Sequence, residues 1–168
     1  DLVNRFGQQT VHDGVSFDVH AGEVFGIVGG SGSGKSVLLK TMLGLRKPDS
    51  GVVELEGRDL TRMTDRELRA VKQRYGVTFQ HGALFTSLTV TENVILPLVE
   101  LLDLDETTLQ SLAELRLRMV GLPVEAGAKF PAQLWRVMIN RAALARALAL
   151  DPARLFLDEP SSGLNAIA

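Results

Sequence analysis

The chain has 168 residues, of which 45% are hydrophobic and 23% are charged, a balance typical of one globular domain with a buried core. It contains no cysteine, which excludes disulfides, thiolate metal ligands and a cysteine nucleophile. The formal net charge of −2 gives no basic footprint for direct nucleic-acid binding. Since no apolar run reaches the roughly 18 residues of a membrane span and no signal-peptide pattern opens the chain, we expect membrane association only through a partner.

The first part of the chain has the pattern of strands and turns. Residues 15–19 alternate apolar and polar side chains, which predicts a half-buried strand. Gly22 ends that strand, and the apolar run at residues 24–28 predicts a second, buried one. Phe6 precedes Gly7 and is by itself interpreted either as a core residue or as an exposed aromatic that stacks on a base.

A glycine-rich motif follows the second predicted strand. Residues 29–36 read GGSGSGKS, which fits the phosphate-loop pattern G-x-x-x-x-G-K-[ST], and residues 37–43 predict a helix after it. The glycines let backbone N–H groups surround a phosphate, and the positive end of the helix dipole points at the same place. Lys35 would reach the β- and γ-phosphates, and the Ser36 hydroxyl would bind Mg²⁺. The expected nucleotide-binding residues are Gly29, Gly30, Ser31, Gly32, Ser33, Gly34, Lys35, Ser36 and Val37. Taken alone, the motif could also be an ordinary glycine-rich turn before a helix.

The middle of the chain continues with strands and a helix. Residues 52–56 predict a strand, and Thr64 with Glu67 form the pattern of a capping box at a helix start. We expect this helix to end at Gly76. The buried strand that follows ends in the polar side chain of Gln80, at the kind of strand end where α/β sheets bind ligands.

The second half of the chain becomes helical. Asp105 is the expected N-cap of one helix, and apolar or small residues on one face predict another helix over residues 134–150. We therefore expect one domain that consists of a helical subdomain at residues 89–150 and an α/β core formed by residues 1–88 and 151–168.

A last apolar strand carries two adjacent carboxylates at its end. Residues 154–157 predict the strand, and Asp158 and Glu159 follow it directly. In a phosphate-loop protein the aspartate belongs to the magnesium shell beside Ser36, and the glutamate is placed to orient or deprotonate the attacking water. A strand followed by an acidic turn would explain this motif alone. Both motifs in this order predict nucleotide binding.

These features occur in the order found in the nucleotide-binding subunit of ABC transporters, which the chain resembles over nearly all of its length. The resemblance is carried by the phosphate loop, Gln80, the helical insert and residues 155–164, LFLDEPSSGL. Within the family, residues 79–90, FQHGALFTSLTV, are similar to the Mla/Mce-type phospholipid transporters. The implied fold is an α/β P-loop NTPase with a RecA-like core sheet, N-terminal antiparallel strands and a helical subdomain.

The resemblance also implies roles for single residues. Phe6 matches the aromatic that stacks on adenine, and Gln80 matches the glutamine that contacts Mg²⁺ and the attacking water. Asp158 matches the Walker B aspartate, so Ser36, Gln80 and Asp158 would form the metal site, and Glu159 matches the catalytic base. The implied protein is an ATPase that uses ATP and Mg²⁺, dimerises as a homodimer or heterodimer, and docks on transmembrane permease subunits. It would sit at the cytoplasmic face of a bacterial inner membrane and power phospholipid movement between the inner and outer membranes.

Three features depart from the family pattern. Residues 134–137 read Leu-Trp-Arg-Val where the family has Leu-Ser-Gly-Gly, and Asn165 stands where the family usually has an aspartate. The chain stops at Ala168, before the segment that carries the family's switch histidine, so a C-terminally truncated domain is expected. Two other functions stay open: a non-catalytic ATP-binding module in an asymmetric complex, and, less favoured, a DNA-maintenance ATPase of the ABC class.

Overall fold

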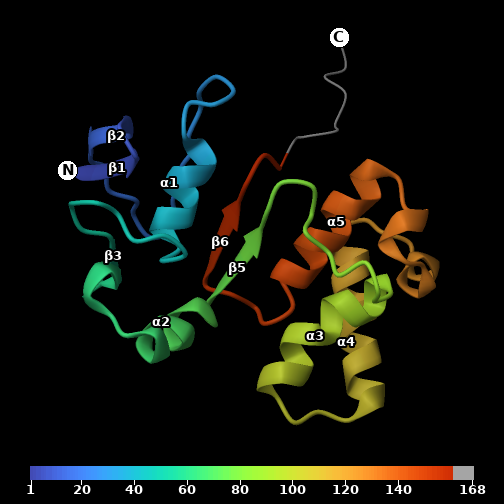
Figure 1. Ribbon diagram of the computed structural model, residues 1–168. Helices are drawn as coiled ribbons and strands as arrows, with labels where there is room; N and C mark the ends of the chain where they lie inside the picture. Colours follow the sequence, from blue (N-terminus) through green and yellow to red (C-terminus); the bar gives the residue numbers. More distant parts are fainter. Residues whose placement is uncertain (161–168) are drawn as a thin grey trace. The chain divides into compact units, whose positions relative to one another are not determined.

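The computed structural model describes residues 1–160 of the chain (Figure 1). The chain divides into two compact units, Asp1–Lys72 and Gln73–Ala168, and each is described by itself. Within residues 1–160, no helix is long and apolar enough to cross a membrane.

The first unit begins with an antiparallel hairpin, as the resemblance implies. β1 (Leu2–Phe6) pairs with β2 (Gln9–Val15) around a turn that includes Gly7, whose φ is 59°. The other elements are α1 (Lys35–Met42), the two-residue strands β3 (Glu54–Leu55) and β4 (Arg58–Asp59), which pair antiparallel, a 3₁₀ helix (Leu60–Arg62) and α2 (Asp65–Lys72). The strand predicted at residues 52–56 is thus reduced to β3.

The two strands predicted before the phosphate loop are wrong. Residues 16–30, all in the described part of the chain, form no strand, and the side chains of Val24 and Val28 are 98% and 96% exposed. Phe17 and Phe25 stack on each other, with ring centroids 4.9 Å apart. An apolar run forms a buried strand only where neighbouring strands take up its backbone hydrogen bonds. The described strands of this unit pair β1 with β2 and β3 with β4 instead.

Helix α2 starts where the sequence predicts but ends earlier. The capping box is confirmed, because the Thr64 hydroxyl accepts from the Glu67 amide and the Glu67 carboxylate accepts from the Thr64 amide. The predicted helix end at Gly76 is wrong, since α2 ends at Lys72 and Gly76 lies in a strand. A Cβ on Gly76 would lie 2.1 Å from the Ala147 carbonyl oxygen, so the glycine serves close packing rather than helix termination.

The described part of the second unit, up to residue 160, contains two parallel strands and a helical segment between them. β5 (Tyr75–Thr78) pairs with β6 (Arg154–Leu157), with Tyr75 opposite Arg154 and Thr78 opposite Leu157. The segment between them holds α3 (Val90–Leu101), α4 (Glu106–Met119), α5 (Arg136–Ala147) and two short 3₁₀ helices, Val124–Ala128 and Pro131–Gln133. The parallel strands end at the same edge, which positions the residues that follow them.

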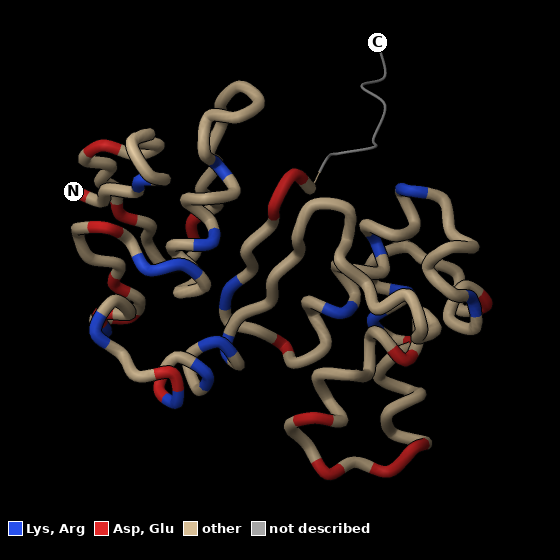
Figure 2. Tube along the Cα trace, viewed as in Figure 1, with Lys and Arg blue, Asp and Glu red and all other residues tan. Residues whose placement is uncertain are grey.

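Helices α3, α4 and α5 pack around one apolar cluster. Its buried members are Val90, Val94, Ala113, Leu117, Leu122, Ala142 and Ala145. Asp105 is confirmed as the N-cap of α4, with its carboxylate accepting from the Thr108 amide at 3.0 Å. Figure 2 shows acidic residues in the turn between α3 and α4. Asp105 and Glu106 stand at the start of α4, where their carboxylates interact favourably with the positive end of the helix dipole.

Candidate functional site

The phosphate loop of the first unit leads directly into α1. Gly34 is the N-cap residue of α1 and has a left-handed φ of 96°. A side chain there would be strained, and its Cβ would lie 2.6 Å from Val11 Cγ1. The predicted residues from Gly29 to Val37 therefore come together as one loop and the first turn of a helix. Free N–H groups at such a helix start form an anion-binding site.

Lys35 crosses back over this loop. Its Nζ donates to the carbonyl oxygens of Gly29 and Gly30, both at 2.8 Å. The ammonium group thus lies over the backbone that the sequence predicts to hold phosphate. Carbonyl oxygens are weaker partners for a cation than phosphate oxygens, so an incoming phosphate can take over this interaction.

Phe6, the predicted adenine-stacking residue, lies at the end of β1. Its side chain is 47% exposed, which contradicts the core interpretation of this residue. The guanidinium carbon of Arg46 lies 4.0 Å from the Phe6 ring centroid, within cation–π range. Phe6 therefore already holds one planar cation, and an adenine ring would add to or replace that contact.

In the second unit, the residues that follow β5 and β6 meet. Nε2 of Gln80 donates to Oε2 of Glu159 at 3.1 Å, and the amide of Asp158 donates to the Thr78 carbonyl at 3.1 Å. Glu159 has a left-handed φ of 49°, a strained conformation that is concentrated at functional sites. A pocket of about 200 Å³ lies beside these strand ends, and its lining includes Asp158, Glu159 and the α5 residues Val137 and Asn140.

The loop after Gln80 is held by a half-buried arginine that sequence reasoning missed. His81, Gly82 and Ala83 all have left-handed φ values, of 63°, 78° and 45°. Nη1 of Arg146 donates to the Ala83 carbonyl at 2.9 Å, and Nη2 donates to the Gly82 carbonyl at 3.1 Å. Burial lowers the pKa of the Arg146 guanidinium. In the sequence, Arg146 is noticeable only as a charged residue among the small residues of α5.

The predicted magnesium ligands have suitable chemistry. A serine hydroxyl, a carboxamide oxygen and a carboxylate are the hard oxygen ligands that Mg²⁺ prefers. Because Nε2 of Gln80 donates to Glu159, its carboxamide oxygen is the atom left for a cation or a water. Ser36 belongs to the first unit, and Gln80 and Asp158 belong to the second, so the joint metal site stays a prediction.

Comparison with protein families decides the class of protein. The model of the family described as "ABC transporter" matches residues 12–162. The chain belongs to the ABC transporter family.

Solved cassettes confirm the fold class. The chain superposes on a dimeric structure of MJ0796, a bacterial ABC transporter cassette, with a TM-score of 0.92 and 30% sequence identity, over 98% of this chain and 74% of that one. A post-hydrolysis structure of the MJ0796 cassette with ADP and Pi gives a TM-score of 0.89 at 30% identity, over 95% of this chain and 72% of that one. The fold is therefore that of an α/β P-loop NTPase of the ATP-binding cassette type.

Curated relatives differ in what they transport. The cassette is 38% identical over 168 residues to the intermembrane phospholipid transport ATP-binding protein MlaF of Haemophilus influenzae, covering all of this chain and 63% of that protein. It is 39% identical to the probable ribonucleotide transport ATP-binding protein mkl of Mycobacterium leprae, covering 99% and 48%. It is 44% identical to the methionine import ATP-binding protein MetN of Mesorhizobium japonicum, covering 98% and 45%. The chain thus spans about half to two-thirds of these proteins, and the Mla/Mce type is not singled out.

The altered family signature lies at the start of α5. Trp135 is the N-cap residue of this helix but makes no side-chain capping bond, and its side chain is 82% exposed. Arg136, the first residue of the helix, is exposed too. This cassette therefore has an indole and a guanidinium at a helix start where the family pattern has serine and glycine. The predicted departure at Asn165 lies outside the described residues.

Proposed function

We propose that this chain binds Mg·ATP and hydrolyses it as the ATP-binding part of an ABC transporter. The observation that carries the proposal is the loop over which Lys35 folds, at a helix start whose N-cap is a left-handed Gly34. The family match supports the same function. Phosphate oxygens would take the place of the Gly29 and Gly30 carbonyls on the Lys35 ammonium group.

The contact between Gln80 and Glu159 supports a role for both in hydrolysis. The Gln80 carboxamide orients the Glu159 carboxylate through its N–H, and the carboxylate accepts a proton from the water that attacks the γ-phosphate. Mg²⁺ on Ser36, Gln80 and Asp158 would neutralise charge on the phosphates. Phe6 would stack on adenine.

The transported substrate is proposed to be a phospholipid. This rests on residues 79–90 and on the similarity to MlaF. The relatives mkl and MetN are as similar to the chain as MlaF is. The partners would be a second ATPase subunit and transmembrane permease subunits at the cytoplasmic face of the membrane. The dimeric MJ0796 structure supports the dimer.

The binding step is tested by calorimetric titration of the chain with Mg·ATP, comparing wild type, Lys35→Ala and Lys40→Ala. Lys40 is the matched control, because it is exposed and lies on the same helix. Lys35→Ala should weaken binding about ten- to a hundredfold, since it removes a charge-assisted contact to phosphate. Lys40→Ala should bind as wild type does. Equal affinities for wild type and Lys35→Ala would refute the phosphate site.

The hydrolysis step is tested in the assembled transporter. Glu159→Gln should keep Mg·ATP affinity and lower turnover by roughly 10²- to 10⁴-fold, the usual contribution of a general base. Turnover that survives this substitution would remove Glu159 from the role of base.

A second candidate is a non-catalytic cassette that pairs with an active partner. The exposed Trp135 and Arg136 at the start of α5 favour it, because they replace small residues that would approach a phosphate closely. The triple variant Trp135→Ser, Arg136→Gly, Val137→Gly distinguishes the two candidates. A gain of turnover in the homodimer of the variant supports the second candidate, and wild-type turnover at the level of the variant supports the first.

A further inference from the structure

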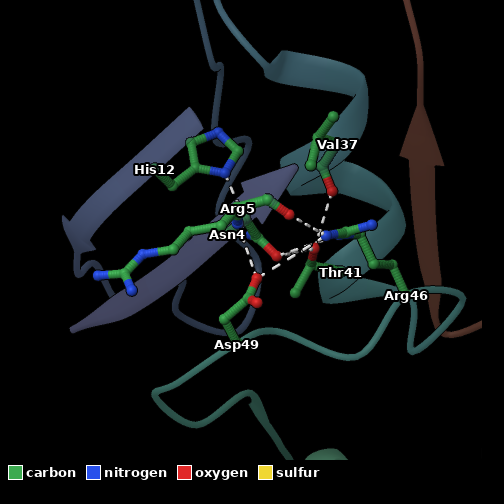
Figure 3. A network of polar contacts seen from close by, with 7 residues as sticks. All are labelled: Asn4, Arg5, His12, Val37, Thr41, Arg46 and Asp49. Atoms are coloured by element: carbon green, nitrogen blue, oxygen red, sulfur yellow. Dashed lines mark hydrogen bonds and ion pairs between the residues drawn. The ribbon is translucent and has the colours of Figure 1, made fainter. Parts of the chain in front are cut away.

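A buried polar network lies under the phosphate loop and is centred on two side chains. Asn4 is 0% exposed and His12 is 7% exposed. Nδ2 of Asn4 lies 3.1 Å from Nδ1 of His12, and Oδ1 of Asn4 accepts from Arg46 Nε at 3.4 Å (Figure 3). The Thr41 hydroxyl lies 3.4 Å from the same oxygen and donates its single hydrogen to the Val37 carbonyl at 2.9 Å. Arg46 Nε can only donate, so it places the amide oxygen of Asn4 on its own side and the amide nitrogen toward His12.

This orientation also fixes the protonation of the histidine ring. Because Nδ2 of Asn4 is a donor, Nδ1 of His12 must accept and carries no hydrogen. In a neutral imidazole the hydrogen then lies on Nε2. Burial lowers the pKa of His12, which keeps the ring neutral.

The Nε2 side of the ring faces the phosphate loop. A Cβ built on Gly34 would lie 2.7 Å from Nε2 of His12. The Gly34 backbone beside the ring raises the pKa of His12 against the larger, opposite effect of burial, the direction expected of a carbonyl that faces a ring N–H. The Gly34 carbonyl also accepts from the Leu38 amide at 2.9 Å, at the start of α1.

We propose that His12 is a positioning residue for nucleotide binding, and that its Nε2–H fixes the Gly34 carbonyl and with it the phosphate-binding turn at the start of α1. The inference rests on the proposed function and adds a residue that lies outside the phosphate motif. His12 touches the loop from behind and does not contact the nucleotide. The Gly34 peptide sets the direction of the N–H groups that follow it, so the hydrogen bond prepares the loop before phosphate arrives.

The same network reaches the predicted base-stacking residue. Arg46 donates to Asn4 Oδ1 and to the Arg5 carbonyl, the latter at 2.7 Å, and its guanidinium covers Phe6. The network therefore connects the phosphate end of the site with its base end inside the first unit.

The test compares His12→Leu, His12→Gln and the control His20→Gln by calorimetric titration with Mg·ATP. Leucine fills the space without a donor, whereas the glutamine amide keeps an N–H near the place of Nε2. His20 is exposed and lies outside the network. Loss of one buried hydrogen bond should raise the dissociation constant of His12→Leu about five- to tenfold. His12→Gln should recover most of the affinity, and His20→Gln should match wild type.

A second measurement does not depend on a variant that folds. The ¹⁵N shifts of the His12 ring in the wild-type chain should show Nδ1 without hydrogen and Nε2 with hydrogen at neutral pH. The opposite tautomer or a charged ring would overturn the inference.

The outcomes separate this inference from the proposed function. If wild type and His12→Leu bind Mg·ATP equally, the positioning role is wrong and the nucleotide site stands. Equal losses in His12→Leu and His12→Gln also overturn it, because the donor would then not matter. If the wild-type chain does not bind Mg·ATP, the proposed function fails and this inference fails with it.

Discussion

The helical segment of the second unit and residues 16–30 of the first unit show opposite relations between apolar sequence and burial. Val90, Val94 and Ala113 in the helical segment are all 0% exposed, whereas Val24 is 98% exposed. A helix satisfies its own backbone hydrogen bonds and needs a partner only for its apolar face. A strand needs partners for its backbone as well. The helical segment therefore holds its core with its own residues, and an apolar run with no strand beside it does not.

The largest expected effect tests the core of the helical segment. Leu117→Ala removes a side chain that is 1% exposed and should lower the free energy of unfolding by about 2–5 kcal/mol. Leu115→Ala is the matched control on the same helix, where the side chain is 49% exposed and the change should stay within about 0.5 kcal/mol. Chemical denaturation of the purified chain gives both values.

The same measurement extends to the exposed run. Val24→Ala should behave like Leu115→Ala, within about 0.5 kcal/mol, because its side chain is 98% exposed. A loss as large as that of Leu117→Ala would mean that residues 24–28 are buried, and the contrast between the two regions would disappear.

An intermediate effect is expected from the arginine that holds the loop after Gln80. Arg146→Ala leaves the Gly82 and Ala83 carbonyls without their charged donors and should cost about 1.5–3 kcal/mol of unfolding free energy. Arg141→Ala is its matched control, because Arg141 lies on the same helix, is exposed and donates to the Gly121 carbonyl at 2.7 Å. Hydrogen exchange should rise at residues 81–83 in Arg146→Ala only. Unchanged exchange there would show that the left-handed loop holds itself.

The smallest effect concerns the start of α4. The hydrogen bonds from the Thr108 hydroxyl and amide lower the pKa of Asp105 below its ordinary value. The stability from this cap is therefore present at neutral pH and is lost as the pH falls below about 4, through the lowered pKa. Asp105→Asn should flatten the pH dependence of thermal unfolding in this acidic range. The control Asp103→Asn changes an exposed neighbour and should keep the pH dependence of the wild type. If thermal unfolding of the wild type does not depend on pH in this range, the Asp105 cap does not contribute to stability.

Short-range features of the sequence predicted the structure best. The capping box at Thr64 and the N-cap at Asp105 depend on residues three positions away, and both are confirmed. The family match and the solved cassettes confirm the fold class that the family resemblance implied. The roles of the individual site residues remain predictions.

Features that depend on residues distant in the sequence were not predicted. Gly76 was predicted to end a helix because glycine is common at that position. Its actual role, close packing against the Ala147 carbonyl, depends on a residue far along the chain and is not visible in the local sequence. Arg146 was missed for the same reason, since its partners Gly82 and Ala83 lie 64 and 63 residues before it. His12 has no motif of its own, and only folding brings its ring to Gly34. Chemistry carried by a contiguous motif is visible in a sequence, and support from a distant side chain is not.

The pairing of Tyr75 with Arg154 has a consequence for folding of the chain during its synthesis on the ribosome. Roughly 80 residues must be translated after β5 before β6 exists, which takes about 4–16 s at the usual 5–20 residues per second. The helical segment is complete before then and can collapse on its own. During that interval the edge of β5 that pairs with β6 lacks its hydrogen-bonding partner. An unpaired strand edge is prone to aggregation, so this is a stage at which chaperone binding would protect the chain.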